Sequence, residues 1–530
     1  MTTAPVSVFP ALGQPVANPN TQADNPANTE SAQSEEGNAA TPQVIQPFAI
    51  HAGVGLNEYY DSNATGLQNG RSDYTTQGVA DLNVHDQTAR FQGDLSYSVS
   101  GYYHANQSQL NAVENYLNGV GHAELYEDHL YLNARAFAWP TFASRLGSLD
   151  AGGDSTANSL NAYGYVVDPD LVWRFDDFAT SHLTLTESGE FFSDLSNASL
   201  GTALPFGGPV NATATGISEQ LKGGQYFGRL EWVATAMATN SSQAGFHDKQ
   251  RSAEADLEYH IDHNFGVILD GGYRSYDTQP SLTRGVSGPI AMGGLAFQPN
   301  ETFSAVVKAG IQYQFTSVTG SLRYQFTPTS QVFATLDDIV TTPQDRLLLG
   351  LGGLDVSQGG FYLPGTLLPN QGSLPGLPAN NGQPVNVAPL DGLALDNIIS
   401  RYRTATFGLV HRMPRDTLTA TAYGVVRDYL LPLPGFDMRQ TVYGGDLSYT
   451  HQFDRDLNGS LSGDYSVAHE FGGTDKIGTF SAFLSYTISR EWSANFRLSY
   501  IDRVSRESIV FSNGTLDDVQ VGLGIRYNFL

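Results

Sequence analysis

The residues best placed to do chemistry in this sequence are charged side chains that recur at alternate positions. Glu254, Asp256 and Glu258 alternate with apolar neighbours over residues 253–261. Because the side chains of a strand alternate between its two faces, these carboxylates share one face and the apolar residues share the other. A dry core does not accept unpaired charges, whereas a water-filled lumen does. The pattern therefore predicts a wet, ionised surface along one face of the strands.

We predict that the charged residues at the alternate positions that form the polar face, here called the polar parity, line a lumen. Opposing charges of this kind set ion selectivity in channels, although a mixed, solvated wall is the default for any wide barrel. The acidic members are Asp94, Glu254, Asp256, Glu258, Asp270, Asp446 and Asp464, and the basic members are Arg135, Arg229, Lys308, Arg323, Arg497 and Arg526. If these groups line a constriction, the excess of acidic groups would disfavour the passage of anions.

Motifs of known enzyme classes are missing from the sequence. It has no G-x-S-x-G elbow, no H-E-x-x-H and no Gly-rich phosphate loop. Residues 454–459 resemble the start of a calcium loop, but Tyr465 stands where the closing Glu is needed, and a turn explains the Asp, Asn and Gly residues. We therefore predict no catalytic residue, no metal site and no cofactor. An enzyme whose site is built from rim residues distant in sequence is the third alternative for function.

The elements that must position these charges are long amphipathic strands. In the clearest run, over residues 90–104, one parity is mostly apolar and the other is polar. Soluble strands are usually about 5–6 residues long, whereas a strand that crosses a bilayer needs about 9–11 residues. Similar runs recur to the end of the chain, where Phe529 precedes Leu530. Outer-membrane barrels close with such a strand, which usually ends on Phe itself.

Connections of two kinds alternate between the runs. Tight polar turns occur, for example, at 413–416 and 454–456, and longer stretches at 140–160, 193–215, 239–250 and 342–399. We predict an all-β fold over residues 46–530: a transmembrane, antiparallel up-and-down β-barrel with short periplasmic turns and long extracellular loops. The count is about 22 strands, or about 18–20 if a run has been split wrongly. An even number leaves both chain ends in the periplasm.

Composition excludes several classes of protein. The chain has 530 residues, an apolar fraction of 40%, 56 Gly, 27 Tyr and no Cys. No apolar run approaches the about 18 residues that a transmembrane helix needs. The lack of Cys fits passage through an oxidising periplasm. The net charge of −26 argues against nucleic acid and anionic membrane surfaces as partners.

Two segments differ from the rest of the chain. Residues 1–45 contain no Lys or Arg and little apolar content, which predicts a disordered periplasmic leader or tether, or else a segment that enters the lumen or binds a partner. No signal peptide is visible, so we expect a processed or trimmed form. The apolar, Gly- and Pro-rich stretch 342–399 is unusual for a solvated loop. It is expected to fold into the lumen as a constriction or plug, to cover the rim or a surface partner, or to be disordered.

Two stretches carry a resemblance to a known family. The sequence EYYDSN at 58–63, followed by Ser72 and Asp73, and the run 401–428 resemble the β-barrel porins found with bacterial exopolysaccharide gene clusters, including those of the PEP-CTERM type. The resemblance spans residues 48–530. It implies a Gram-negative outer-membrane barrel in polysaccharide secretion, with outer-membrane lipid and polysaccharide or periplasmic export components as partners. It carries over no catalytic residue.

Two functions follow from these expectations. A barrel of this size cannot fill itself with side chains, which favours an outer-membrane channel, either an exit pore for a polysaccharide or a porin for small solutes. The alternative is a non-conducting structural or surface-binding barrel whose long loops hold glycan or a partner protein.

Overall fold

The computed structural model describes residues 48–67, 70–142, 159–193, 211–243, 246–279, 286–341, 399–430, 439–470, 473–506 and 514–529. The predicted N-terminal segment 1–45 and the stretch 342–398 lie outside these residues. The described residues form 22 strands and two single-turn 3₁₀ helices, η2 (Ser108–Leu110) and η3 (Gln225–Phe227).

The strands are long and follow one another along the chain. They are β1 (Phe48–Asp61), β2 (Asp73–Gln87), β3 (Phe91–His104), β4 (Ala112–Tyr126), β5 (Leu130–Phe142), β6 (Ser159–Phe175), β7 (Ala179–Phe192), β8 (Ala212–Gly223), β9 (Leu230–Gln243), β10 (Phe246–His260), β11 (Phe265–Gln279), β12 (Val286–Asn300), β13 (Phe303–Gln312), β14 (Phe315–Thr327), β15 (Ser330–Thr341), β16 (Ser400–Arg412), β17 (Asp416–Tyr429), β18 (Arg439–Gln452), β19 (Leu457–Glu470), β20 (Gly473–Thr487), β21 (Trp492–Arg506) and β22 (Gly514–Phe529).

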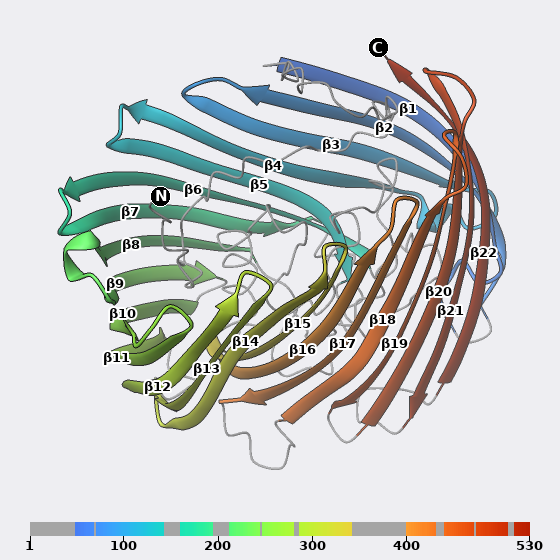
Figure 1. Cartoon of the computed structure of the whole chain (residues 1–530). Helices are drawn as coiled ribbons and strands as arrows, with labels where there is room; N and C mark the ends of the chain where they lie inside the picture. The colour runs from blue at the N-terminus through green and yellow to red at the C-terminus, as the bar shows by residue number, and fades with distance from the viewer. Residues whose placement is uncertain are drawn as a thin grey trace.

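The strands close into a barrel. Each strand pairs antiparallel with the next in sequence, and β1 also pairs with β22. In this seam the register runs from Ala52 opposite Phe529 to Asp61 opposite Gln520, and Figure 1 shows β22 beside β1. The predicted all-β, antiparallel up-and-down barrel of about 22 strands is confirmed. Over this register β1 and β22 pair with each other, so neither strand presents an open backbone edge there.

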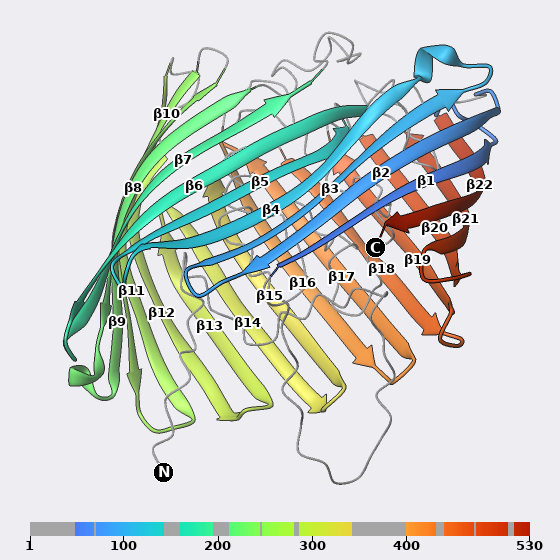
Figure 2. The ribbon, with the colours of Figure 1, turned by 90° about the horizontal axis from the view of Figure 1, so that it is seen from above.

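The two ends of the barrel carry different connections. Residues 328–329 join β14 to β15 and residues 413–415 join β16 to β17, and Figure 2 shows these hairpins on one side of the molecule. At the other end, 193–211 separates β7 from β8 and 342–399 separates β15 from β16. We call these the turn end and the loop end. The long connection predicted at 239–250 is wrong, because β9 continues to Gln243 and β10 begins at Phe246.

Exposure alternates along each strand and separates the two faces of the wall. In β1, Val54 and Leu56 are exposed, whereas Asn57 and Tyr59 are only 5% and 6% exposed. The apolar parity thus faces out, where exposed Leu269 and Leu523 continue it around the barrel. An apolar exterior is stable in lipid and costly in water.

Aromatic rings form a belt on the outer face at the turn end. The rings of Phe265, Phe297, Phe303 and Tyr324 follow one another across β11–β14, with centroid separations of 5.8, 5.8 and 5.9 Å. At the seam, Tyr527 contacts Trp492 at 5.0 Å and Phe529 at 5.1 Å. Aromatic girdles mark the boundary between hydrocarbon and water in membrane barrels. The belt places that boundary near the short turns.

Candidate functional site: the lumen-facing charges

The predicted lumen charges, with one exception, lie in strands on the face opposite to the apolar exterior. They are Asp94, Arg135, Glu254, Asp256, Glu258, Asp270, Lys308, Arg323, Asp446, Asp464, Arg497 and Arg526. On β10, for example, Glu254, Asp256 and Glu258 are less exposed than Leu257 and Tyr259, which point outward. The structure brings only some of these charges into contact, and it pairs several of them with residues that the sequence did not single out.

Arg229 is the exception. It lies in the connection 224–229, one residue before β9 (Leu230–Gln243), and its Nη1 donates to the carbonyl oxygen of Ile261 at 3.2 Å. The η3 turn lengthens this connection, so that Arg229 lies outside the strand. Its hydrogen bond links two neighbouring turns at the rim, and the side chain does not line the wall.

The strands β10 to β13 hold a compact acid–base cluster. Arg274 donates from Nε and Nη2 to both carboxylate oxygens of Glu254, and the Nη2 to Oε2 distance is 2.6 Å. Lys308 Nζ lies 2.7 Å from Asp270 Oδ2. Because charged groups in a low-dielectric wall need partners, these contacts neutralise both cations. The predicted charges Glu254, Asp270 and Lys308 are therefore mainly paired within the wall.

Another ion pair bridges three strands at the seam. Arg526 Nη2 of β22 lies 2.5 Å from Asp81 Oδ2 of β2, although β1 runs between them. Gly53 of β1 makes this possible, since a Cβ there would lie 2.9 Å from both Arg526 Nη2 and Asp81 Oδ1. Because glycine has no Cβ, the two charged groups can meet above the backbone of β1.

Other pairs involve residues that the sequence analysis did not select. Arg503 of β21 donates through Nε and Nη2 to the two oxygens of Asp475 of β20, at 3.0 and 3.1 Å. His85 Nδ1 lies 2.6 Å from Asp94 Oδ1 near the turn end. Asp475 and Arg503 lie on the same inward parity as the predicted set, so a complete listing of charges on that parity could have found them.

Two pairs of carboxylates face each other directly in neighbouring strands. Asp256 is the register partner of Asp270, and Asp446 is the register partner of Asp464. Like charges directly opposite each other destabilise a strand pair. The first pair has the Lys308 ammonium beside it. Within the described residues, neither Asp446 nor Asp464 forms an ion pair with Lys, Arg or His.

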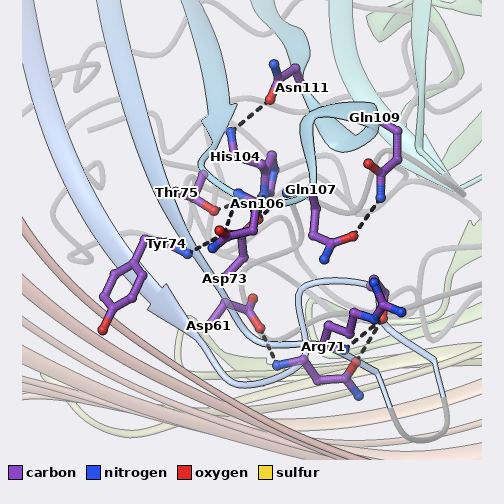
Figure 3. Close-up of polar contacts among 12 residues, drawn as sticks. Asp61, Arg71, Asp73, Tyr74, Thr75, His104, Asn106, Gln107, Gln109 and Asn111 are labelled. Atoms are coloured by element: carbon purple, nitrogen blue, oxygen red, sulfur yellow. Dashed lines mark hydrogen bonds and ion pairs between the residues drawn. The ribbon is translucent and has the colours of Figure 1, made fainter.

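The acids of the motif that carries the family resemblance hold the loop end together. Asp73, whose side chain is fully buried, accepts hydrogen bonds from Tyr74 N, Asn106 N and Nδ2, and Gln107 N, at 2.8 to 3.0 Å (Figure 3). Asp61 accepts from Asn63 N at 2.7 Å. Carboxylates that accept several backbone N–H groups stabilise turns. The motif therefore fastens the loops that follow β1 and β3.

The described part of the chain also bears on the calcium-loop motif and on membrane-spanning helices. Those residues contain no group of three or more His, Cys, Asp or Glu that could hold a metal ion. Asp454 Oδ1 accepts from the backbone N of Asp456 and Leu457 at 2.8 and 2.7 Å, as the turn interpretation of 454–459 predicts. No helix among the described residues is long and apolar enough to span a membrane.

Comparison with known proteins gives structural likeness only. No protein-family model matches the chain, and no curated protein does. The FrpB iron transporter from Neisseria meningitidis (F5-1 variant) aligns with a TM-score of 0.49 and 10% identity, over 90% of this chain and 82% of that chain. The ferric-catecholate import receptor Fiu from E. coli K12 gives 0.48 and 10%, over 90% and 81%. The ferripyoverdine receptor of Pseudomonas aeruginosa, bound to ferripyoverdine, gives 0.47 and 11%, over 91% and 72%.

The location of the protein follows from its own wall. A closed antiparallel barrel satisfies every strand edge internally, and its exterior is aliphatic with an aromatic belt. Barrels of this construction reside in the outer membrane of Gram-negative bacteria. The protein is an outer-membrane β-barrel, as the sequence analysis predicted.

Proposed function

We propose that the barrel is a non-enzymatic channel through which hydrophilic solutes cross the outer membrane. The observation that supports this proposal is the charged inner face of a closed 22-stranded wall. A wall of that circumference encloses more space than its own side chains occupy. Charges such as Asp94 and Arg323, both exposed on the inward parity, are stable there only in contact with water.

The finer proposal concerns the cargo. The family resemblance favours an exit pore for a secreted polysaccharide, and a porin for small solutes is the broader version. Several lumen cations, including Lys308, Arg503 and Arg526, already contact carboxylates of the wall. Since these contacts neutralise the cations and their carboxylates alike, the selectivity of the lumen depends on the remaining charges, and aspartates without an ion pair among the described residues, such as Asp446 and Asp464, favour cations and neutral molecules over anions.

The test is single-channel recording of the full chain in planar bilayers. We expect discrete conductance steps. In a KCl gradient, the sign of the reversal potential should show that K⁺ permeates more readily than Cl⁻. Asp446→Asn together with Asp464→Asn should reduce this cation preference. The absence of conductance over the full range of voltage and salt would overturn the channel.

The non-conducting alternative is favoured by the connections at the loop end. Nineteen residues (193–211) separate β7 from β8, and a much longer stretch, 342–399, separates β15 from β16. Long loops on a rigid barrel are a common platform for binding. Glycan-array binding that disappears on deletion of 345–395, in a barrel with no conductance, would select this function instead.

A further inference from the structure

Polar residues of three neighbouring strands lie around Gly444 of β18 on the inward face. The register partner of Gly444 is Ser466 of β19, two residues from Asp464, and Asp446 follows Gly444 on the same face. From β17, the hydroxyl oxygen of Tyr423 reaches over this position, since a Cβ on Gly444 would lie 2.6 Å from it. The missing Cβ of Gly444 therefore makes room for the Tyr423 hydroxyl, and Asp446, Asp464 and Ser466 lie beside it on the same face.

Several of these oxygens are buried without a hydrogen-bond donor. Asp446 is 7% exposed and its Oδ1 has no partner, and Ser466 is fully buried with an unpartnered Oγ. Asp464 accepts from the Thr479 hydroxyl through Oδ1, while its Oδ2 is buried without a partner. Buried polar atoms nearly always find a partner, because leaving one unsatisfied costs about 1–3 kcal/mol.

The charge of this group requires compensation as well. Asp446 and Asp464 face each other, and no cationic side chain among the described residues pairs with either of them. At the equivalent pair Asp256–Asp270, the ammonium group of Lys308 occupies that role. A cation that is coordinated by oxygen atoms would compensate this charge and satisfy the unpartnered oxygens of the Gly444 group.

We propose that the group around Gly444 binds a divalent metal cation of the calcium type. Ca²⁺ binds carboxylate and hydroxyl oxygens and tolerates irregular arrangements, whereas Mg²⁺ demands a near-ideal octahedron. Two carboxylates match its charge. Asp446 and Asp464 supply the charged ligands, and Ser466 and Tyr423 supply neutral oxygens, with water completing the shell. This site lies in the wall and does not depend on whether the barrel conducts.

The experiment is a calcium titration of the purified full-length barrel in detergent, after removal of metals with EDTA. Calorimetric binding and the midpoint of thermal unfolding are measured with CaCl₂, with MgCl₂, and with NaCl at matched ionic strength. We expect saturable Ca²⁺ binding and a raised midpoint, a weaker response to Mg²⁺ and none to NaCl. Asp446→Asn with Asp464→Asn should abolish the response. The matched control Asp256→Asn, which alters the pair that Lys308 already serves, should retain it.

Further outcomes decide against the proposal. A Ca²⁺ response of equal size in the double Asn variant, or an equal response to NaCl, would overturn it. Should the double variant fail to form a barrel, Ser466→Ala provides the test, because it removes one neutral ligand without changing charge. We expect at least a several-fold loss of Ca²⁺ affinity in Ser466→Ala, and unchanged affinity there would also reject the site.

Discussion

The wall at β10–β13 and the wall at β17–β20 meet the same electrostatic problem in two ways. Each contains two aspartates in direct register, Asp256 with Asp270 and Asp446 with Asp464. In the first region, Lys308 from β13 extends to 2.7 Å from Asp270. In the second region, no cation among the described residues pairs with either aspartate, and Asp464 accepts from the Thr479 hydroxyl instead.

The difference shows that parity alone does not determine the electrostatics of a barrel wall. Both pairs lie on inward positions of adjacent strands, so the alternation of the strands does not distinguish the two places. What differs is the group that reaches each pair: Lys308 extends from β13, two strands beyond Asp270, in one case, and Thr479 of β20 lies directly opposite Asp464 in the other. The first region compensates its charge internally, and the second is left open to a ligand.

The largest effect is expected from removing the cation of the first region. Lys308→Met leaves Asp270 and Asp256 facing each other without a counter-charge and should lower the free energy of unfolding by about 2–3 kcal/mol, somewhat less than for a fully buried pair, because Lys308 retains some exposure. Urea unfolding in detergent measures this loss. Lys308→Arg is the matched control and should retain most of the stability. A Met variant as stable as the parent protein would contradict the comparison.

A smaller effect is expected at the Arg526–Asp81 ion pair, which bridges three strands. This pair compensates charge within the wall at the seam. Gly53→Ala places a methyl group 2.9 Å from both charged groups of the Arg526–Asp81 pair. The flexible side chains can move, so the cost should be about 1 kcal/mol. Gly55→Ala is the control for strand propensity, because its nearest neighbour would be at 3.5 Å, an ordinary contact. Equal unfolding midpoints for the two variants would show that the bridge contributes nothing.

The smallest effect has the opposite sign. In EDTA, Asp446→Asn should raise the free energy of unfolding by about 0.5–1 kcal/mol, because it removes one of two like charges in register. Asp256→Asn should raise the free energy of unfolding by less, since Lys308 already compensates the charge of that pair. Paired urea titrations of both variants give the difference. A larger gain for Asp256→Asn would reverse the assignment of the compensated and open regions.

The fold was largely accessible from sequence because its main signal is local. A period of two along residues 90–104 needs no knowledge of partners, and the same pattern repeated over the chain yielded the number of strands. The failure at 239–250 has a physical cause. Near the loop end, residues such as Lys249 and Arg251 are polar on the outward parity, so the amphipathic contrast fades while the strand continues.

The site was less accessible because its contacts are set by register across strands. Nothing near Arg526 in the sequence indicates that Asp81 is its partner, since the contact depends on β22 closing against β1 and on Gly53 between them. Arg229 was misplaced because one residue decides whether a side chain belongs to a turn or to the wall. Parity identified the lumen face, but it could not show which charges neutralise each other.

The bridge between Arg526 and Asp81 also has a consequence for assembly. Its partners are 445 positions apart in sequence, and they can meet only after the first and last strands have joined. Until that moment both edge strands carry unpaired backbone groups, which hydrocarbon does not tolerate. Insertion into the bilayer and ring closure should therefore occur together, and the Arg526–Asp81 contact serves as a marker of the completed ring.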